Sequence, residues 1–254
     1  VLYACNERQR PIYLDPVISG EKNFVFALTE TSSNSDPVND MQTRAVLDGD
    51  NWIINGRKFM NTNHFGAEFV TLLAVTDPNN RRKGITMFLV DLDTPGITPT
   101  KINTWIHEPL SKAPAEVVYE DVKVPAWKVL GDVGGGFKVG QKWLTTEYRL
   151  QYAGRALGRM SRALDICVDW TKNRTSSGRP LATRQAIQWM LVDMYVWMEA
   201  LRTLVYRTAW RSDHGDEQDA VAHGSMIKLL AGQWGFQALD NAMQIMGGVG
   251  QTLD

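Results

Sequence analysis

The fold class of this chain is decided by two short runs, Phe69-Val-Thr-Leu-Leu-Ala-Val75 and Ile85-Thr-Met-Phe-Leu-Val90, with the turn signal Asp77-Pro-Asn-Asn80 between them. Both runs are rich in β-branched and aromatic residues, which favour strands, and both are short for a helix. Similar runs occur at Phe24–Thr29, Thr43–Leu47, Asn51–Asn55 and Val117–Tyr119. Many short strands with turns between them predict an antiparallel β-barrel or sandwich domain over residues 24–130.

The pattern becomes helical in the second half of the chain. Apolar residues recur at three- and four-residue spacing through Leu144–Asn173 and Ala182–His214, and Gln218–Ile245 continues the pattern up to Gly247-Gly248. Three long helices in antiparallel succession predict a helix bundle over residues 131–254, one face of which could meet a partner subunit. The predicted class is therefore α+β and multidomain.

Composition excludes several classes of protein. The 27 basic and 28 acidic residues give a formal net charge of -1, whereas nucleic acid or an anionic membrane surface would favour a basic excess. Two cysteines and four scattered histidines make neither a disulfide framework nor a metal site, and free thiols suit a reducing compartment. No apolar stretch is long enough to span a membrane. We therefore expect a protein of the cytoplasm or mitochondrial matrix.

Five motifs, in this order, resemble the signatures of the acyl-CoA dehydrogenase family. They are Thr29-Glu30-Thr-Ser-Ser-Asn-Ser35-Asp36; Asp50-Asn-Trp-Ile-Ile-Asn-Gly-Arg-Lys-Phe-Met-Asn-Thr-Asn63; Glu120-Asp-Val-Lys-Val-Pro125 with Gly135-Gly-Phe137; Asn173-Arg174 with Gly178 and Gln185; and Gln244-Ile-Met-Gly-Gly-Val-Gly250. Each motif alone is weak, but their order over nearly the whole chain is specific.

The resemblance implies an FAD-dependent enzyme that converts an acyl-CoA thioester into a trans-2-enoyl-CoA and passes the electrons to an electron-transfer flavoprotein. It also implies a fragment, in which residues 1–23 are the tail of an N-terminal helical domain and the bundle is truncated. The family's usual catalytic glutamate would then lie beyond Asp254. In one branch of the family the base sits on the first bundle helix, where Tyr148 stands here. A tyrosine is a poor base, so the adjacent Glu147 is a weak candidate.

Several residues match the family's flavin contacts. The resemblance places Phe26, Leu28 and Thr29 along the flavin edge, where the Thr29 hydroxyl and nearby amides would donate to the ring. Met60 replaces a tryptophan that covers the flavin, and a thioether can still pack on the ring face. Thr62 matches a threonine near the flavin phosphates. On local sequence alone, Thr29 could equally be a turn residue at a strand end.

Other matches fall in the helical half and at the substrate. Arg174, Ser177 and Gln185 match positions that reach the flavin pyrophosphate and adenosine across a subunit interface, and Gln244, Gly247 and Gly248 would cradle the same pyrophosphate. Such sharing implies at least a homodimer, and the family is mostly tetrameric. Ser35 and Arg149 match residues near the CoA portion of the substrate. Plain alternatives are a helix stop at Gly247-Gly248, a solvated loop serine at Ser35 and a solvated charge at Arg149.

Other functions remain open at this point. An acyl-CoA oxidase or a flavin monooxygenase of the same fold would share every motif, because these enzymes differ in oxygen access to the reduced flavin. A non-catalytic, flavin-binding relative is a third alternative, and a β domain plus bundle without any cofactor is a fourth. Acyl chain length and branching cannot be derived from the sequence, because one methylene contributes only about 1–3 kcal/mol to discrimination.

Overall fold

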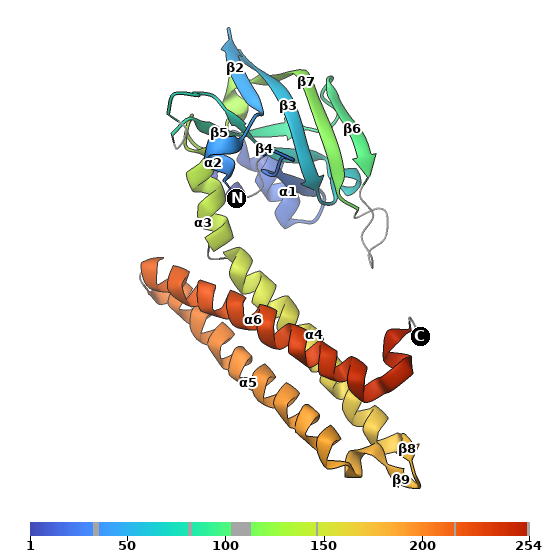
Figure 1. Ribbon diagram of the computed structural model, residues 1–254. Coiled ribbons are helices and arrows are strands. Elements are labelled where there is room, and N and C mark those ends of the chain that lie inside the picture. The colour runs from blue at the N-terminus through green and yellow to red at the C-terminus, as the bar shows by residue number, and fades with distance from the viewer. Residues whose placement is uncertain (33–35, 81–82, 103–112, 146, 216, 253–254) are drawn as a thin grey trace. The chain divides into compact units, whose positions relative to one another are not determined.

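The computed structural model describes residues 1–254 apart from 33–35, 81–82, 103–112, 146, 216 and 253–254 (Figure 1). It forms two compact units, Val1–Lys142 and Trp143–Asp254. The first holds a curled β-sheet and the second a helix bundle, so the predicted fold class is confirmed. The domain limits predicted from the sequence, 1–23, 24–130 and 131–254, stay predictions.

The N-terminal segment packs on the sheet of the first unit. It consists of a 3-10 turn (Leu2–Ala4), a π-helical turn (Arg10–Leu14) and the short helix α1 (Asp15–Ile18). The buried Gln9 amide donates to the carbonyl oxygens of Trp127 and Val129, each at 2.7 Å. Tyr13 packs edge-on against Phe69, with ring centroids 4.8 Å apart. These contacts make the segment part of the β unit.

Seven strands form the sheet. They are β1 (Phe24–Ala27), β2 (Arg44–Asp48), β3 (Asn51–Asn61), β4 (Phe69–Val75), β5 (Ile85–Asp91), β6 (Ile97–Ile102) and β7 (Ala115–Pro125). The strand order is β1-β4-β2-β3-β7-β6, and β5 pairs with β4. The short helix α2 (Pro37–Asp40) lies between β1 and β2, and 3-10 turns follow β3 (His64–Gly66) and β7 (Ala126–Lys128).

One part of the topology corrects the sequence prediction. β1 runs parallel to β4, with Phe24 opposite Phe69 and Ala27 opposite Leu72, and β2 also meets β4 in a parallel pair between Arg44 and Val75. The prediction of a wholly antiparallel sheet was therefore wrong at this end. The chain between β1 and β2 is too long for a tight hairpin, so β1 is free to pair with a strand distant in sequence.

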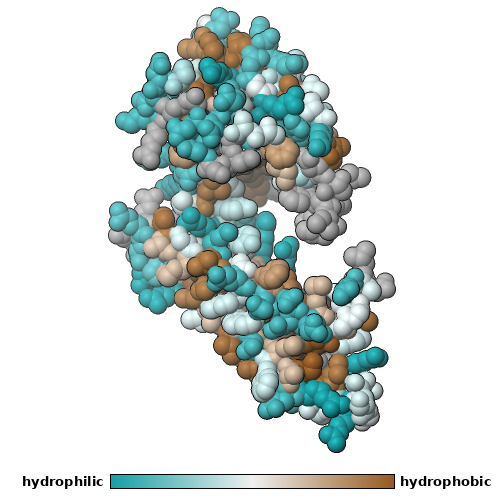
Figure 2. All heavy atoms as spheres, in the orientation of Figure 1, coloured by the Kyte–Doolittle hydropathy of each residue, from teal (hydrophilic) through white to brown (hydrophobic). Residues whose placement is uncertain are grey.

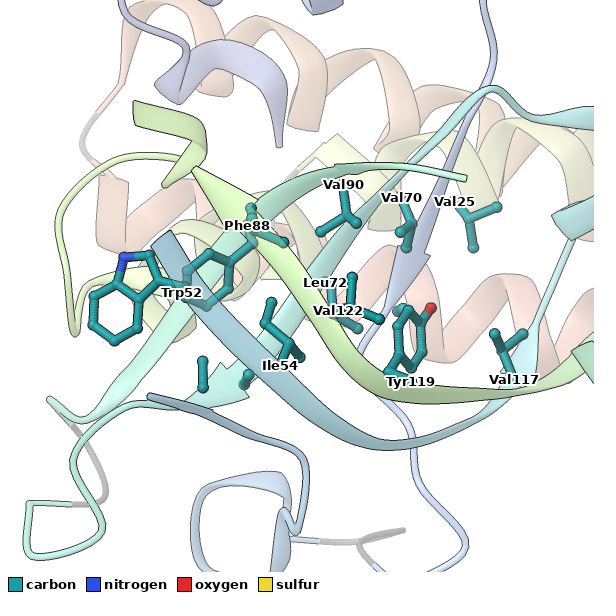
Figure 3. Close-up of a cluster of buried hydrophobic side chains, with 14 of the residues drawn as sticks. Val25, Trp52, Ile54, Val70, Leu72, Phe88, Val90, Val117, Tyr119 and Val122 are labelled. Carbon is teal, nitrogen blue, oxygen red and sulfur yellow. The ribbon is translucent and has the colours of Figure 1, made fainter. Parts of the chain in front are cut away.

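The curled sheet encloses its own apolar core. Every residue of β4 is buried, because this strand is covered on both faces. Trp52 on β3 and Phe88 on β5 meet edge-on with ring centroids 5.5 Å apart, and Tyr119 on β7 lies among valines of the same cluster (Figure 3). Burial of these large side chains stabilises the curled sheet.

The helical unit is a three-helix bundle. Helix α3 (Gly136–Thr145) precedes α4 (Glu147–Asn173), which is followed by α5 (Gln185–His214) and α6 (Glu217–Met246). A two-stranded hairpin, β8 (Thr175–Ser176) with β9 (Arg179–Pro180), and a 3-10 turn (Leu181–Thr183) join α4 to α5, and a second 3-10 turn (Gly247–Gln251) follows α6. Figure 2 shows hydrophobic residues on the surface of the bundle. Large exposed aromatic side chains of α5 include Trp189, Tyr206 and Trp210. No helix among the described residues is long and apolar enough to cross a membrane.

Candidate functional site

The end of β1 is tied to β3 by its carbonyl groups. The Leu28 carbonyl oxygen accepts a hydrogen bond from Lys58 Nζ at 3.1 Å, and the Thr29 carbonyl oxygen accepts one from the Phe59 N–H at 2.8 Å. Residues 28–30 are thus held against β3 although β1 itself pairs with β4. The predicted residues Leu28 and Thr29 therefore lie on a fixed edge of backbone rather than in a free loop.

A buried ion pair anchors the same edge. Lys58 Nζ lies 2.9 Å from Glu30 Oε1, and the two side chains are 0% and 3% exposed. Glu30 also accepts hydrogen bonds from the N–H groups of Gln42, at 2.7 Å, and Thr43, at 3.0 Å. One carboxylate thereby joins the end of β1, the start of β2 and the middle of β3.

Burial and pairing set the charges of this pair. Burial lowers the pKa of Lys58 to about 8, and the Glu30 carboxylate offsets part of that effect. Burial by itself raises the pKa of Glu30, but attraction and hydrogen bonding from Lys58, together with the Thr43 and Gln42 bonds, bring it below its ordinary value. Both groups are therefore charged at neutral pH.

The donors of this edge remain available. Among the described residues, the backbone N–H groups of Leu28 and Thr29 and the Thr29 hydroxyl have no hydrogen-bond partner. The carbonyl groups of this edge are already hydrogen-bonded, whereas its donors are not. The edge can therefore donate hydrogen bonds to a ligand that carries acceptors. An electron-rich ring edge such as N1 and O2 of a flavin supplies acceptors of that kind.

Three further predicted residues surround this edge in the first unit. The half-buried Phe26 points toward α3, because a Cβ on Gly140 would lie 3.3 Å from its ring. Met60 has φ 58°, a left-handed conformation that costs a non-glycine residue about 1–3 kcal/mol and that is enriched at functional sites. It lies in a register shift between Lys58 and Asn61, so a bulge directs its side chain. Thr62 follows it and is exposed.

A second group of predicted residues meets on the helical unit. Arg174, Gly247 and Gly248 line one surface groove of about 560 Å³, together with Trp170, Ser176 and Leu181. The Arg174 guanidinium lies 6.0 Å from the Trp170 ring centroid, and the side chain is exposed. A guanidinium beside two glycines, which let a ligand approach the backbone closely, is a suitable donor set for a diphosphate.

Three other predicted residues of this unit do not line the groove. Ser177 lies in the β8–β9 hairpin with φ 51°, while Gln185 begins α5 and Gln244 lies near the end of α6. All three are exposed. Their predicted roles toward the flavin adenosine and pyrophosphate stay predictions.

The predicted substrate and base residues have mixed outcomes. Arg149 on α4 donates to Ser225 Oγ on α6 at 2.7 Å, so part of its guanidinium already holds two helices together. Glu147 is exposed at the start of α4, and Tyr148 beside it packs on Trp143 with ring centroids 4.9 Å apart. Ser35 and Asp254 lie outside the described residues. The roles of Arg149, Glu147 and Ser35 stay predictions.

Comparison with known proteins gives the family. The model of the acyl-CoA dehydrogenase middle domain matches residues 25–122, and that of the acyl-CoA dehydrogenase C-terminal domain matches residues 134–254. The chain therefore belongs to the acyl-CoA dehydrogenase family. Among the described residues, no cluster of histidine, cysteine or acidic side chains could hold a metal ion.

The relatives span several activities. The chain is 36% identical to the mitochondrial short-chain specific acyl-CoA dehydrogenase of Bos taurus over 244 residues, which are 96% of this chain and 58% of that protein. It is 36% identical to the 3-(aryl)acrylate reductase of Clostridium sporogenes (strain ATCC 15579), over 98% of this chain and 64% of that protein. The solved structure of butyryl-CoA dehydrogenase from Megasphaera elsdenii superposes with a TM-score of 0.90 at 32% identity, covering 97% of this chain and 63% of that one. The chain thus spans about six-tenths of these relatives.

The residues present fit a flavin dinucleotide. In the first unit, the donors at Leu28 and Thr29 have no partner among the described residues and suit the ring edge of a flavin. In the second unit, taken by itself, the Arg174 guanidinium beside Gly247 and Gly248 suits a diphosphate. Lys58 and Glu30 lie within two of the sequence motifs, but the motifs predict no role for them. The pairing of Glu30 with Lys58 could not be predicted from the sequence, because the end of β1 and β3 come together only in the folded sheet.

Proposed function

We propose that the full-length protein binds FAD and catalyses the α,β-dehydrogenation of an acyl-CoA thioester to a trans-2-enoyl-CoA. The observation that carries the proposal is the edge at Leu28 and Thr29, whose carbonyls are bonded to β3 while its N–H groups and hydroxyl have no partner in the part of the chain that the structure describes. Membership of the family supports the same reading. Flavin bound at this edge supplies the hydride acceptor of the reaction.

Each part of the site has a task in this proposal. The Leu28 and Thr29 donors orient the ring and stabilise negative charge at its pyrimidine edge. The Met60 side chain would pack against a ring face, and Phe26 would limit the position of the ring from the β1 side. Arg174, with the backbone at Gly247 and Gly248, holds the diphosphate of a cofactor shared with a neighbouring copy, assisted by Gln244, Ser177 and Gln185.

Proton removal at the substrate Cα needs a carboxylate. Glu147 is exposed and lies next to Tyr148 on α4, so it remains only a weak candidate. We propose that the base is a carboxylate beyond Asp254, and that Arg149 and Ser35 contact the CoA portion. The proposed electron acceptor is an electron-transfer flavoprotein, and the proposed assembly is a homodimer or homotetramer. The free thiols suit the cytoplasm or the mitochondrial matrix.

The experiment uses the full-length protein that contains this chain. The protein is loaded with FAD, desalted and examined by visible absorption, and the flavin band is then followed under anaerobic conditions with acyl-CoA thioesters of different chain length. We expect a retained chromophore that bleaches with at least one thioester. A protein that leaves the column without flavin would refute the proposal, and rapid reoxidation by air after bleaching would favour an oxidase.

A further inference from the structure

We propose that Lys58 is a positioning residue for the flavin, because it fixes and polarises the peptide unit between Leu28 and Thr29 so that the Thr29 N–H faces the cofactor. The inference rests on the proposed function, since it concerns the same flavin edge. It goes beyond that function because it proposes that the buried charge of Lys58 on β3 controls the cofactor indirectly, through the peptide unit between Leu28 and Thr29.

Peptide geometry carries the first step. The Leu28 carbonyl and the Thr29 N–H belong to one planar, trans peptide unit, so they point in opposite directions. Lys58 Nζ holds that carbonyl toward β3 at 3.1 Å. The Thr29 N–H is consequently directed away from β3, and it has no partner among the described residues. The orientation of the donor is therefore set by the lysine.

The neighbouring peptide repeats the arrangement. The Phe59 N–H holds the Thr29 carbonyl at 2.8 Å, so the following N–H also points away from β3. Glu30 ends this edge with its carboxylate 2.9 Å from the same Lys58 Nζ. Residues 28–30 are thus held by Lys58 and Phe59 of β3. In each of these bonds the group on β3 is the donor, and the group on residues 28–30 is the acceptor. A lysine in the middle of this arrangement prevents the peptide from rotating.

Electrostatics carries the second step. Lys58 is fully buried, so its positive charge acts on the Leu28 carbonyl without screening by water. A cation bonded to a carbonyl polarises the whole peptide and makes the N–H of that unit a stronger donor. A reduced flavin carries more negative charge at its pyrimidine edge than an oxidised one. Loss of the cation should therefore weaken binding of the reduced form more than binding of the oxidised form.

A purely structural ion pair would behave differently. Replacing both partners of a buried pair by apolar residues of similar size is often neutral or stabilising. K58M/E30M is such a double variant, and it supplies no donor to the Leu28 carbonyl. It also removes the acceptor of the Gln42 and Thr43 N–H groups, so the single variant E30M, which removes that acceptor and keeps Lys58, is measured beside it. If the pair served stability alone, the double variant would bind flavin no more weakly than E30M does. The two roles can therefore be separated.

The test compares full-length wild type with K58M, K58R, E30M and the double variant K58M/E30M. The control is K128M, which removes the lysine of the partly buried Lys128–Asp91 pair in the same unit. FAD dissociation constants and the reduction potential of the bound flavin are measured at a temperature where all proteins are folded. The ¹³C shift of the Leu28 carbonyl is recorded in flavin-free protein, as a readout that needs no activity.

We expect K58M/E30M to fold, to bind FAD at least 10-fold more weakly than E30M does and to have a lower flavin potential, while K128M changes neither property of the wild type. A reduced form that loses 10-fold more affinity than the oxidised form corresponds to a fall of about 30 mV. K58R should recover part of both effects, and the Leu28 carbonyl shift should move in K58M/E30M. If K58M fails to fold, K58R and the double variant still decide the question.

The outcomes separate the two claims. Wild-type protein that binds FAD, together with a double variant whose affinity, potential and Leu28 shift equal those of E30M, would overturn the role of Lys58 and leave the proposed function standing. Wild-type protein that binds no FAD would overturn the proposed function, and the flavin role of Lys58 with it.

Discussion

Replacement of Arg174 by alanine tests the diphosphate end of the proposed flavin site. The backbone of Arg174 is fixed independently of its side chain, because its N–H donates to Trp170 and its carbonyl accepts from Leu181, each at 2.8 Å. The side chain is exposed and has no ion pair among the described residues. R174A should therefore leave the fold intact and remove only what the guanidinium gives to a ligand.

The size of the effect follows from the exposure of the group. A hydrogen bond to a charged group contributes about 1.5–3 kcal/mol, and a two-pronged contact at an exposed site should contribute about that much in total because water screens it. The FAD dissociation constant should then rise about 10- to 150-fold. R174K keeps the charge but loses the planar fork, so it should fall between R174A and wild type.

The assay is titration of flavin-free, full-length protein by quenching of flavin fluorescence. FMN, which lacks the diphosphate, is titrated in parallel, and its affinity should not change. R162A removes another exposed arginine, on α4, and controls for net charge. An FAD affinity of R174A within twofold of wild type, or an equal loss for FMN, would refute the assignment of Arg174 to the diphosphate.

Three further predictions concern the interior. Y119F removes a buried hydroxyl that has no partner among the described residues, so urea denaturation should give a free energy of unfolding equal to wild type or up to about 1 kcal/mol higher; a loss above 1 kcal/mol would mean that the hydroxyl is satisfied. G136A should lower the free energy of unfolding by about 1–3 kcal/mol, because the new methyl group would collide with the Met87 backbone nitrogen. G158A, with no atom within 4 Å of the new methyl group, should raise it by about 1 kcal/mol. Equal shifts of the thermal midpoint in the two variants would contradict this contrast. Burial raises the pKa of the Cys167 thiol from 9.0 to about 11. Alkylation of Cys167 in native protein at pH 8 should therefore be about 100-fold slower than in urea, and it should accelerate toward pH 11. Labelling at the same rate in both states would exclude a buried thiol.

Much of the fold could be predicted because its strands and helices differ in period. β4 and β5 were predicted almost to their ends, because both are continuous apolar runs bounded by turn residues. β6 was missed because Ile97–Ile102 is nearly all exposed and contains Pro99, which an edge strand tolerates. Helix α3 was not predicted, because the helical pattern was recognised only from Leu144 on, and its last residues were joined to α4.

The pairing of β1 could not be predicted for a different reason. No local pattern specifies which distant strand a short apolar run will join, so the parallel pair of β1 and β4 becomes visible only in the folded unit. The same reason hid the Lys58–Glu30 pair, since Lys58 lies on β3 and Glu30 follows β1, and these two strands do not neighbour each other in the sheet order. Motif order predicted the roles of Thr29, Arg174 and the glycines, because a resemblance carries positions over even where local physics leaves alternatives. These roles stay predictions.

The parallel position of β1 also has a consequence for the order of folding. Phe24 pairs with Phe69 across 45 residues, whereas β4 and β5 are neighbours in the chain. Closing the longer loop costs more conformational entropy, so we expect the β4–β5 hairpin to form early and β1 to dock last. This strand, which Thr29 follows, would then be the final piece of the sheet to become ordered, and cofactor present during synthesis would act on the newly made chain at its slowest step.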